Sequence, residues 1–206
     1  MLPPAGLLLA PGAGADASQP QLVAIDEALS ALGWVVARMD FPYRLAGRRA
    51  PDRAPVLLAA VRDAAAELIE RTGLPPARLV LGGRSMGGRI CSMAVADGLR
   101  AAGLILVSYP LRPPGRPDKQ AERTAHFPRL SIPCLFVSGT KDAFGSPSEL
   151  EAATTAIPGP VTHAWIEGAS HALHGPDVRI GERVVEWAAS LSAARPPGHP
   201  PAGPPR

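Results

Sequence analysis

The chain contains few cysteines, and neither lies in a metal-binding or redox motif. Only two are present among 206 residues, Cys91 and Cys134, and both have mainly apolar neighbours. The C-x-x-C spacing that is typical of zinc and thiol–disulfide sites does not occur. We therefore expect two reduced thiols in a hydrophobic core, no bound metal and no other cofactor.

Long hydrophobic runs and blocks of like charge are also missing. The apolar run at 7–10 is too short to cross a bilayer, and the N-terminus lacks the charged region and cleavage site of a signal peptide. The formal net charge is only +3, and no five like charges follow one another. We infer a soluble, cytoplasmic protein that binds neither membranes nor nucleic acid.

Aromatic residues make up only 4% of the chain, so Leu, Val, Ile and Ala must fill most of the core. The chain is 46% hydrophobic over 206 residues, which suffices for one domain but not for two. We place this domain at 1–194. Residues 195–206 are rich in Pro and Gly and cannot form a core, so we expect a disordered tail there.

Short apolar runs alternate with longer amphipathic ones. The apolar runs predict buried strands, and the helical spacing of apolar residues between them predicts helices. Such alternation indicates an α/β fold with a doubly wound, mostly parallel six-stranded sheet and helices on both faces. The predicted strands are 6–10, 34–39, 78–81, 103–108, 133–139 and 161–166, and the predicted helices are 18–32, 55–70, 86–96, 146–157 and one after 177; 40–54 and 109–130 are predicted loops.

The segment 83–87 matches the G-x-S-x-G pattern of a nucleophile elbow. A predicted strand precedes it and a predicted helix follows it, which is the context that the motif requires. Ser85 is therefore the candidate nucleophile, held in strained backbone geometry that requires small neighbours. The Met86 N–H at the start of the helix is the first candidate oxyanion donor. The alternative is a tight strand–helix turn in an inactive enzyme or a binding fold.

A serine nucleophile needs a general base and a carboxylate to orient it, in the chain order Ser, Asp or Glu, His. Asp142 lies in the loop after the fifth predicted strand, and His171 in the loop after the sixth. His174, three residues further on, is the rival base. In doubly wound sheets, ligands bind beyond the carboxyl ends of the strands, where all these loops meet.

The loop after the first strand is the expected source of the second oxyanion donor. Ala13 N–H is the candidate, with Gly14 close behind and also a candidate substrate contact. The loop lacks the full G-x-G-x-x-G pattern, so a dinucleotide site is not expected. The other candidate substrate contacts are Tyr43, Arg84 and Tyr109. Arg84, Tyr43 and Arg112 either favour an acidic or polar substrate, or are two solvated arginines and a packed tyrosine.

Four segments together carry a family resemblance: 41–43 (FPY), 82–89 (GGRSMGGR), 108–111 (SYPL) and 137–142 (VSGTKD). They resemble small dienelactone-hydrolase-like members of the α/β-hydrolase superfamily. More narrowly, they resemble a group that includes a testis-expressed protein and a subunit of the NSL histone-acetyltransferase complex. The resemblance implies the hydrolase fold and a triad of Ser85, Asp142 and His171, without a known substrate.

The chain departs from that pattern in three places. Pro11-Gly12 stands where superfamily enzymes commonly carry His-Gly, and Ser85 stands where dienelactone hydrolases carry cysteine. The two antiparallel strands that often open the fold are not predicted, so we expect a trimmed sheet.

These observations predict a serine esterase that cleaves a small ester, thioester or lactone as a monomer or homodimer. The excursion 109–130 is too short and aperiodic for a lid domain, so we expect an open site. The alternative is a catalytically weak or inactive interaction module that has kept the fold.

Overall fold

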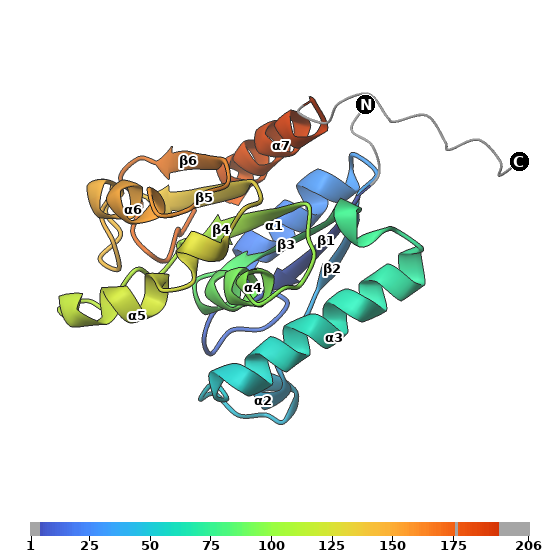
Figure 1. Cartoon of the computed structure of the whole chain (residues 1–206), viewed down its shortest axis with the longest axis horizontal. Helices are drawn as coiled ribbons and strands as arrows, with labels where there is room; N and C mark the ends of the chain where they lie inside the picture. The colour runs from blue at the N-terminus through green and yellow to red at the C-terminus, as the bar shows by residue number, and fades with distance from the viewer. Residues whose placement is uncertain (1–4, 176, 194–206) are drawn as a thin grey trace, which may run out of the picture.

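Six parallel strands form one sheet at the centre of the computed structural model, in the order β2-β1-β3-β4-β5-β6 (Figure 1). The structure describes residues 5–175 and 177–193, so the predicted tail at 195–206 lies outside the described residues. The strands are β1 (Gly6–Ala10), β2 (Val35–Arg38), β3 (Leu79–Arg84), β4 (Gly103–Val107), β5 (Cys134–Gly139) and β6 (Val161–Ile166).

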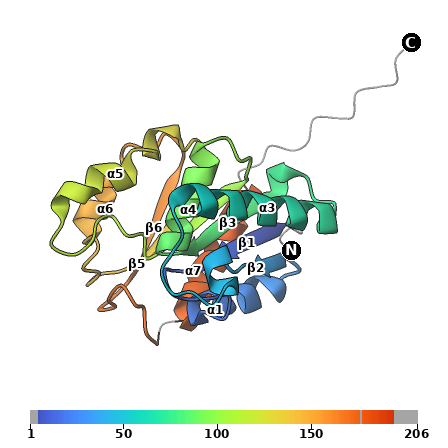
Figure 2. The same ribbon diagram turned by 90° about the horizontal axis from the view of Figure 1, so that it is seen from below.

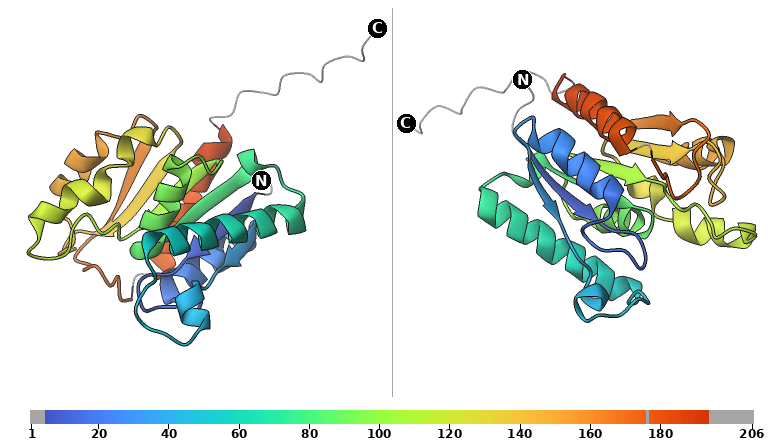
Figure 3. Two further views of the ribbon diagram at one scale, coloured as in Figure 1. Left: turned by 60° about the horizontal axis from the view of Figure 1, so that its bottom comes forward. Right: turned by 180° about the vertical axis from the view of Figure 1, so that it is seen from behind.

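Helices cover both faces of the sheet, as Figures 2 and 3 show. On one face lie α1 (Pro20–Ser30) and α7 (Asp177–Ala193), and on the other lie α3 (Ala54–Thr72), α4 (Met86–Ala96) and α6 (Pro147–Thr154). This arrangement confirms the predicted doubly wound α/β class, with every described strand pair parallel.

Burial on both faces explains why the strands read as continuous apolar runs. In β1, Leu7 and Leu9 belong to the core cluster beneath α1 and α7, whereas Leu8 packs into the cluster beneath α3 and α4. Both cysteines are free and buried, as expected. Burial raises the pKa of each thiol to about 12, so both are held as neutral core groups.

Two predicted loops contain short helices that the sequence pattern did not show. Within 40–54 the structure has α2 (Pro42–Leu45), and within 109–130 it has α5 (Gln120–Thr124). Helices of this length are too short to display a helical period of apolar residues. Among the described residues, no helix is both long and apolar enough to span a membrane.

The order in which strands are added reverses at β1, because β2 pairs with one edge of β1 and β3 with the other. A crevice opens at such a switch point beyond the carboxyl ends of the strands, because the connections leave toward opposite faces. The loop after β1 and the turn after β3 meet at this crevice.

Candidate active site

Ser85 occupies the turn between β3 and α4. Its backbone has φ 50° and ψ −113°, a conformation that residues other than glycine rarely adopt. Its N–H donates to the Val107 carbonyl at 2.8 Å, and its carbonyl accepts from Arg89 N–H at 3.1 Å. These bonds to β4 and to α4 hold the serine in a strained position, which is typical of functional sites.

Glycines around Ser85 allow β1, the turn and α4 to approach closely. A Cβ atom on Gly83 would lie 2.4 Å from the Ala10 carbonyl oxygen, and one on Gly87 would lie 2.1 Å from the same atom. Both distances are far below any allowed contact. The expectation that small residues flank the serine is confirmed, and the reason is backbone crowding at the end of β1.

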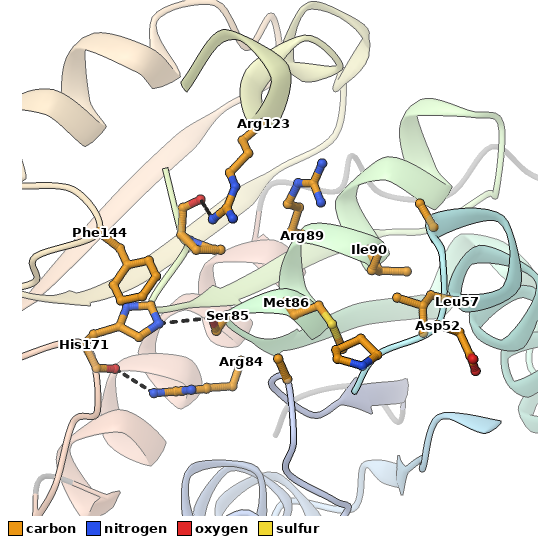
Figure 4. Close-up of a pocket in the computed structure, with 14 residues that line it drawn as sticks. Asp52, Leu57, Arg84, Ser85, Met86, Arg89, Ile90, Arg123, Phe144 and His171 are labelled. Carbon is orange, nitrogen blue, oxygen red and sulfur yellow. Dashed lines mark hydrogen bonds between the residues drawn. The ribbon is translucent and has the colours of Figure 1, made fainter. Parts of the chain in front are cut away.

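Ser85, His171 and Asp142 form a chain of hydrogen bonds across three loops. Ser85 Oγ lies 3.0 Å from His171 Nε2, and His171 Nδ1 lies 2.8 Å from Asp142 Oδ2 (Figure 4 shows the first of these contacts). With its Nδ1 proton donated to the carboxylate, the imidazole presents Nε2 as an acceptor for the serine hydroxyl proton. This is the geometry that a general base requires.

Asp142 is buried, at 5% exposure, and its loop is tied to the histidine loop. The Phe144 N–H donates to Asp142 Oδ1 at 2.8 Å, and the Lys141 N–H donates to the Ala169 carbonyl at 2.9 Å. A Cβ on Gly139 would lie 2.2 Å from that same carbonyl oxygen, so glycine is needed where the two loops meet. The tie fixes the carboxylate relative to the imidazole.

Three further side chains hold His171 or the residue after it, and two of them, Phe144 and Gln21, escaped the sequence analysis. The Phe144 ring stacks on the imidazole with a centroid separation of 3.9 Å. Arg84 Nη2 donates to the His171 carbonyl at 2.9 Å, and Gln21 Nε2 donates to the Ala172 carbonyl at 3.3 Å. The position of Phe144 two residues after Asp142 could have indicated its backbone bond to the carboxylate, because an Asp commonly accepts the N–H two residues on, but not the stacking of its ring. Gln21 gave no such signal.

A cavity of about 470 Å³ opens beside Ser85, within the size range of small-molecule sites. Ser85, His171 and Phe144 line it near the hydroxyl. One wall is apolar and includes Ala54, Leu57, Met86 and Ile90. Arg89 and Arg123 lie together on one side of Ser85, whereas Arg84 lies on the other side and reaches toward His171, as Figure 4 shows.

The candidate oxyanion donors also line this cavity. Met86 is the first residue of α4, so its N–H belongs to the helix donors that have no intrahelical acceptor. Ala13 lines the cavity from the loop after β1. The neighbouring Gly14 N–H donates to Tyr43 Oη at 3.1 Å, which engages Gly14 and leaves Ala13 as the donor candidate of this loop.

Two predicted substrate contacts are corrected by their burial. Tyr43 is fully buried in the core and holds the loop after β1 through its bond to Gly14. Tyr109 is 2% exposed, and its hydroxyl donates to the Arg123 carbonyl at 2.7 Å. Both tyrosines therefore support the cavity wall from behind.

The arginines named from the sequence are also engaged with the protein. Arg84 lines the cavity, but its guanidinium holds the His171 carbonyl. Burial lowers the pKa of Arg84, and the nearby Asp142 carboxylate opposes this effect. Arg112 pairs with Glu149.

His174, the rival base considered from the sequence, is exposed. Among the described residues, no group of three His, Cys, Asp or Glu side chains is placed to hold a metal.

Comparison with known proteins agrees with the observed fold. A family model described as alpha/beta hydrolase domain matches residues 3–193. A serine hydrolase without a lid from Xanthomonas campestris superposes with a TM-score of 0.74 at 18% identity, covering 95% of this chain and 86% of that one. Est1E from Butyrivibrio proteoclasticus gives 0.73 at 16% identity, with 94% and 90% covered. A structure from the work on LipS and LipT, two metagenome-derived lipolytic enzymes, gives 0.72 at 18% identity, with 90% and 93% covered.

Proposed function

Because the chain belongs to the alpha/beta hydrolase domain family, we propose that it is a serine hydrolase that cleaves a small ester, thioester or lactone. The observation that carries the proposal is the chain of bonds from Ser85 Oγ to His171 Nε2, at 3.0 Å, and from His171 Nδ1 to Asp142, at 2.8 Å. The serine end of this chain of bonds lies at a cavity large enough for a small molecule, and the serine itself is held in strained backbone geometry. A purely structural turn does not require these features together.

The proposed reaction has two steps. Ser85 Oγ attacks the carbonyl carbon while His171 Nε2 takes the hydroxyl proton, and Asp142 stabilises the imidazolium that forms. The Met86 and Ala13 N–H groups stabilise the oxyanion of the tetrahedral intermediate. His171 returns the proton to the departing alcohol or thiol, which leaves an acyl-enzyme. Water, deprotonated by His171, then attacks the acyl carbon, and the acid departs as Ser85 is restored.

The finer assignments are part of the same proposal. These are the carboxylic ester class, an open site and a dienelactone-hydrolase-like character. A narrower kinship with the testis-expressed and histone-acetyltransferase-complex proteins, a cytoplasmic location and a monomeric or homodimeric state also belong to it. A catalytically inactive interaction module is the competing outcome.

Labelling with a fluorophosphonate probe tests the proposal, because the probe reacts preferentially with an activated serine. We expect wild type to be labelled and Ser85→Ala and His171→Ala to be unlabelled. The matched control is Ser92→Ala, since Ser92 Oγ also contacts a histidine, His126, at 2.8 Å, but is fully buried. Labelling of this control should persist.

Turnover of p-nitrophenyl acetate gives the second measurement. Loss of Ser85 or His171 should lower kcat by about 10⁶-fold, whereas Asp142→Asn should lower it by about 10⁴-fold. Folded wild-type protein that takes up no probe and cleaves no ester would favour the interaction module.

A further inference from the structure

Two arginines share one end of the cavity that contains Ser85. Arg89 lies on α4 four residues after Ser85, which places both on the same side of the helix, and Arg123 comes from α5. Figure 4 shows the two guanidinium groups approaching each other on one side of Ser85, opposite the apolar wall at Leu57. Residues far apart in the chain thus bring two positive charges to the candidate nucleophile.

Neither guanidinium is neutralised by the part of the chain that the structure describes. Arg89 forms no ion pair there, and its buried Nε has no hydrogen-bond partner. Arg123 Nη1 donates to the Pro110 carbonyl at 3.0 Å, and its charge forms no ion pair with any described residue. Among the described residues, Asp52 is the one carboxylate that lines the cavity, and it lies 2.8 Å from Arg48 Nη1. Several other arginines are paired with acids, as in Arg38–Asp26, Arg44–Asp16, Arg112–Glu149, Arg116–Asp118, Arg129–Asp97 and Arg183–Glu186.

The groups behind the two arginines are neutral. Ser92, His126 and Tyr109 form a buried polar layer there, and burial, together with the charges of Arg89 and Arg129, lowers the pKa of His126 to about 4. Burial, and then the charge of Arg89, lowers the pKa of Arg123. The adjacent carboxylate of Glu122 opposes this effect, but it does not line the cavity and lies 3.4 Å from Lys119 Nζ. Two partly buried like charges are unfavourable, and an anion between them would remove the repulsion.

We propose that Arg89 and Arg123 form a subsite for a carboxylate carried by the substrate of Ser85. The proposal rests on the proposed function, since it assigns the substrate class of that same site. A planar carboxylate fits the paired donors of guanidinium groups, and each such charge-assisted bond is strong in a partly buried site. The apolar wall opposite would hold the uncharged part of the substrate. The preferred substrates are therefore small esters or thioesters that bear a carboxylate.

Matched pairs of charged and neutral esters test the subsite. The first pair is the mono-p-nitrophenyl ester of adipic acid and its methyl-capped counterpart, with the charge on the acyl side. The second pair is 4-acetoxybenzoate and its methyl ester, with the charge on the leaving side. We expect wild type to prefer the charged member of at least one pair, measured as the ratio of the two kcat/KM values.

The arginine variants show whether these side chains cause the preference. Arg89→Gln and Arg123→Gln should each lower the charged-to-neutral ratio by about 10- to 100-fold, and Arg123→Lys should restore part of it. The matched control is Arg116→Gln, which removes an exposed arginine from the same excursion and should leave the ratio unchanged. Circular dichroism checks that each variant is folded. A ratio that is unchanged in both arginine variants would overturn the subsite.

Failure of the subsite can be distinguished from failure of the hydrolase proposal. Probe labelling of Ser85 without any preference for charged esters would overturn the subsite and leave the hydrolase intact. If wild type neither reacts with the probe nor cleaves an ester, calorimetric titration with monomethyl adipate decides the matter. Binding that is lost in Arg89→Gln and Arg123→Gln supports the subsite alone, and no binding to wild type overturns it.

Discussion

The Phe144 ring lies against the imidazole of His171, with ring centroids 3.9 Å apart and planes inclined by 25°. The backbone N–H of the same residue donates to Asp142 Oδ1 at 2.8 Å. One residue thus fixes both the proposed base and the carboxylate that orients it. The two effects can be separated, because a side-chain substitution removes the ring and keeps the N–H.

We expect Phe144→Ala to lower kcat/KM for a neutral ester by about 3- to 10-fold, as aromatic stacking contributes about 0.5–1.5 kcal/mol. The imidazole would lose its orientation while the bond to Asp142 persists. Steady-state kinetics on p-nitrophenyl acetate measures the effect, with Phe144→Tyr as the variant that keeps the ring. Equal kcat/KM values for Phe144→Ala and wild type would exclude an orienting role for the ring.

Arg84 should act through His171 and not through substrate charge. Its Nη2 donates to the His171 carbonyl at 2.9 Å, so Arg84→Gln should weaken the hold on the histidine loop. We expect kcat/KM to fall by about 10-fold or more for charged and neutral esters alike, the effect of losing one charged hydrogen bond. A loss confined to charged esters would instead return Arg84 to the role in acidic-substrate binding considered from the sequence.

Gly87 is required because of the Ala10 carbonyl. A Cβ on Gly87 would lie 2.1 Å from that oxygen, so Gly87→Ala must separate α4 from β1. We expect the free energy of unfolding to fall by about 3 kcal/mol or more, at the upper end of overpacking effects. Urea denaturation measures it. Gly6→Ala is the control, since its nearest neighbour would lie at an ordinary 3.4 Å, and similar losses in both variants would contradict this explanation.

His126 should make stability depend on pH. Burial, and then the charges of Arg89 and Arg129, lowers its pKa from 6.5 to about 4, while its hydroxyl partner Ser92 lies 2.8 Å away. Above pH 6.5 both the folded and unfolded states hold it neutral, so it contributes no pH dependence there. As pH falls from 6.5 to 4, the unfolded chain takes up the proton first, and the folded state is destabilised by up to about 3 kcal/mol.

The variant His126→Gln removes this titration. Urea unfolding at several pH values should show a smaller loss of stability below pH 6.5 for the variant than for wild type. Comparing the two curves cancels the contributions of the carboxylates and of His163, whose pKa is also lowered by burial. Parallel curves would show that His126 is not the group responsible.

The sequence by itself determined the sheet and the positions of the main site loops. Buried parallel strands require apolar residues on both faces, so the run at 6–10 and the other apolar runs marked strands whatever surrounded them. The elbow could be read because its geometry demands local residue types: glycines at 83 and 87, with Ser85 between a strand and a helix. Asp142 and His171 followed from chain order and from the convergence of loops at the carboxyl ends of parallel strands.

Only the tertiary structure decided which side chains face the cavity. Tyr43 and Tyr109 point into the core, and Phe144 reaches His171, because packing between distant segments fixes each side chain's direction. Arg89 and Arg123 are 34 positions apart, and nothing in their local sequences indicates that they share one end of a cavity. Periodicity records whether a residue is buried, but the neighbours that it meets depend on how the loops pack. The fold and the proposed nucleophile could be predicted because local residue types indicate them, whereas the arginine pair depends on loop packing and could not be predicted.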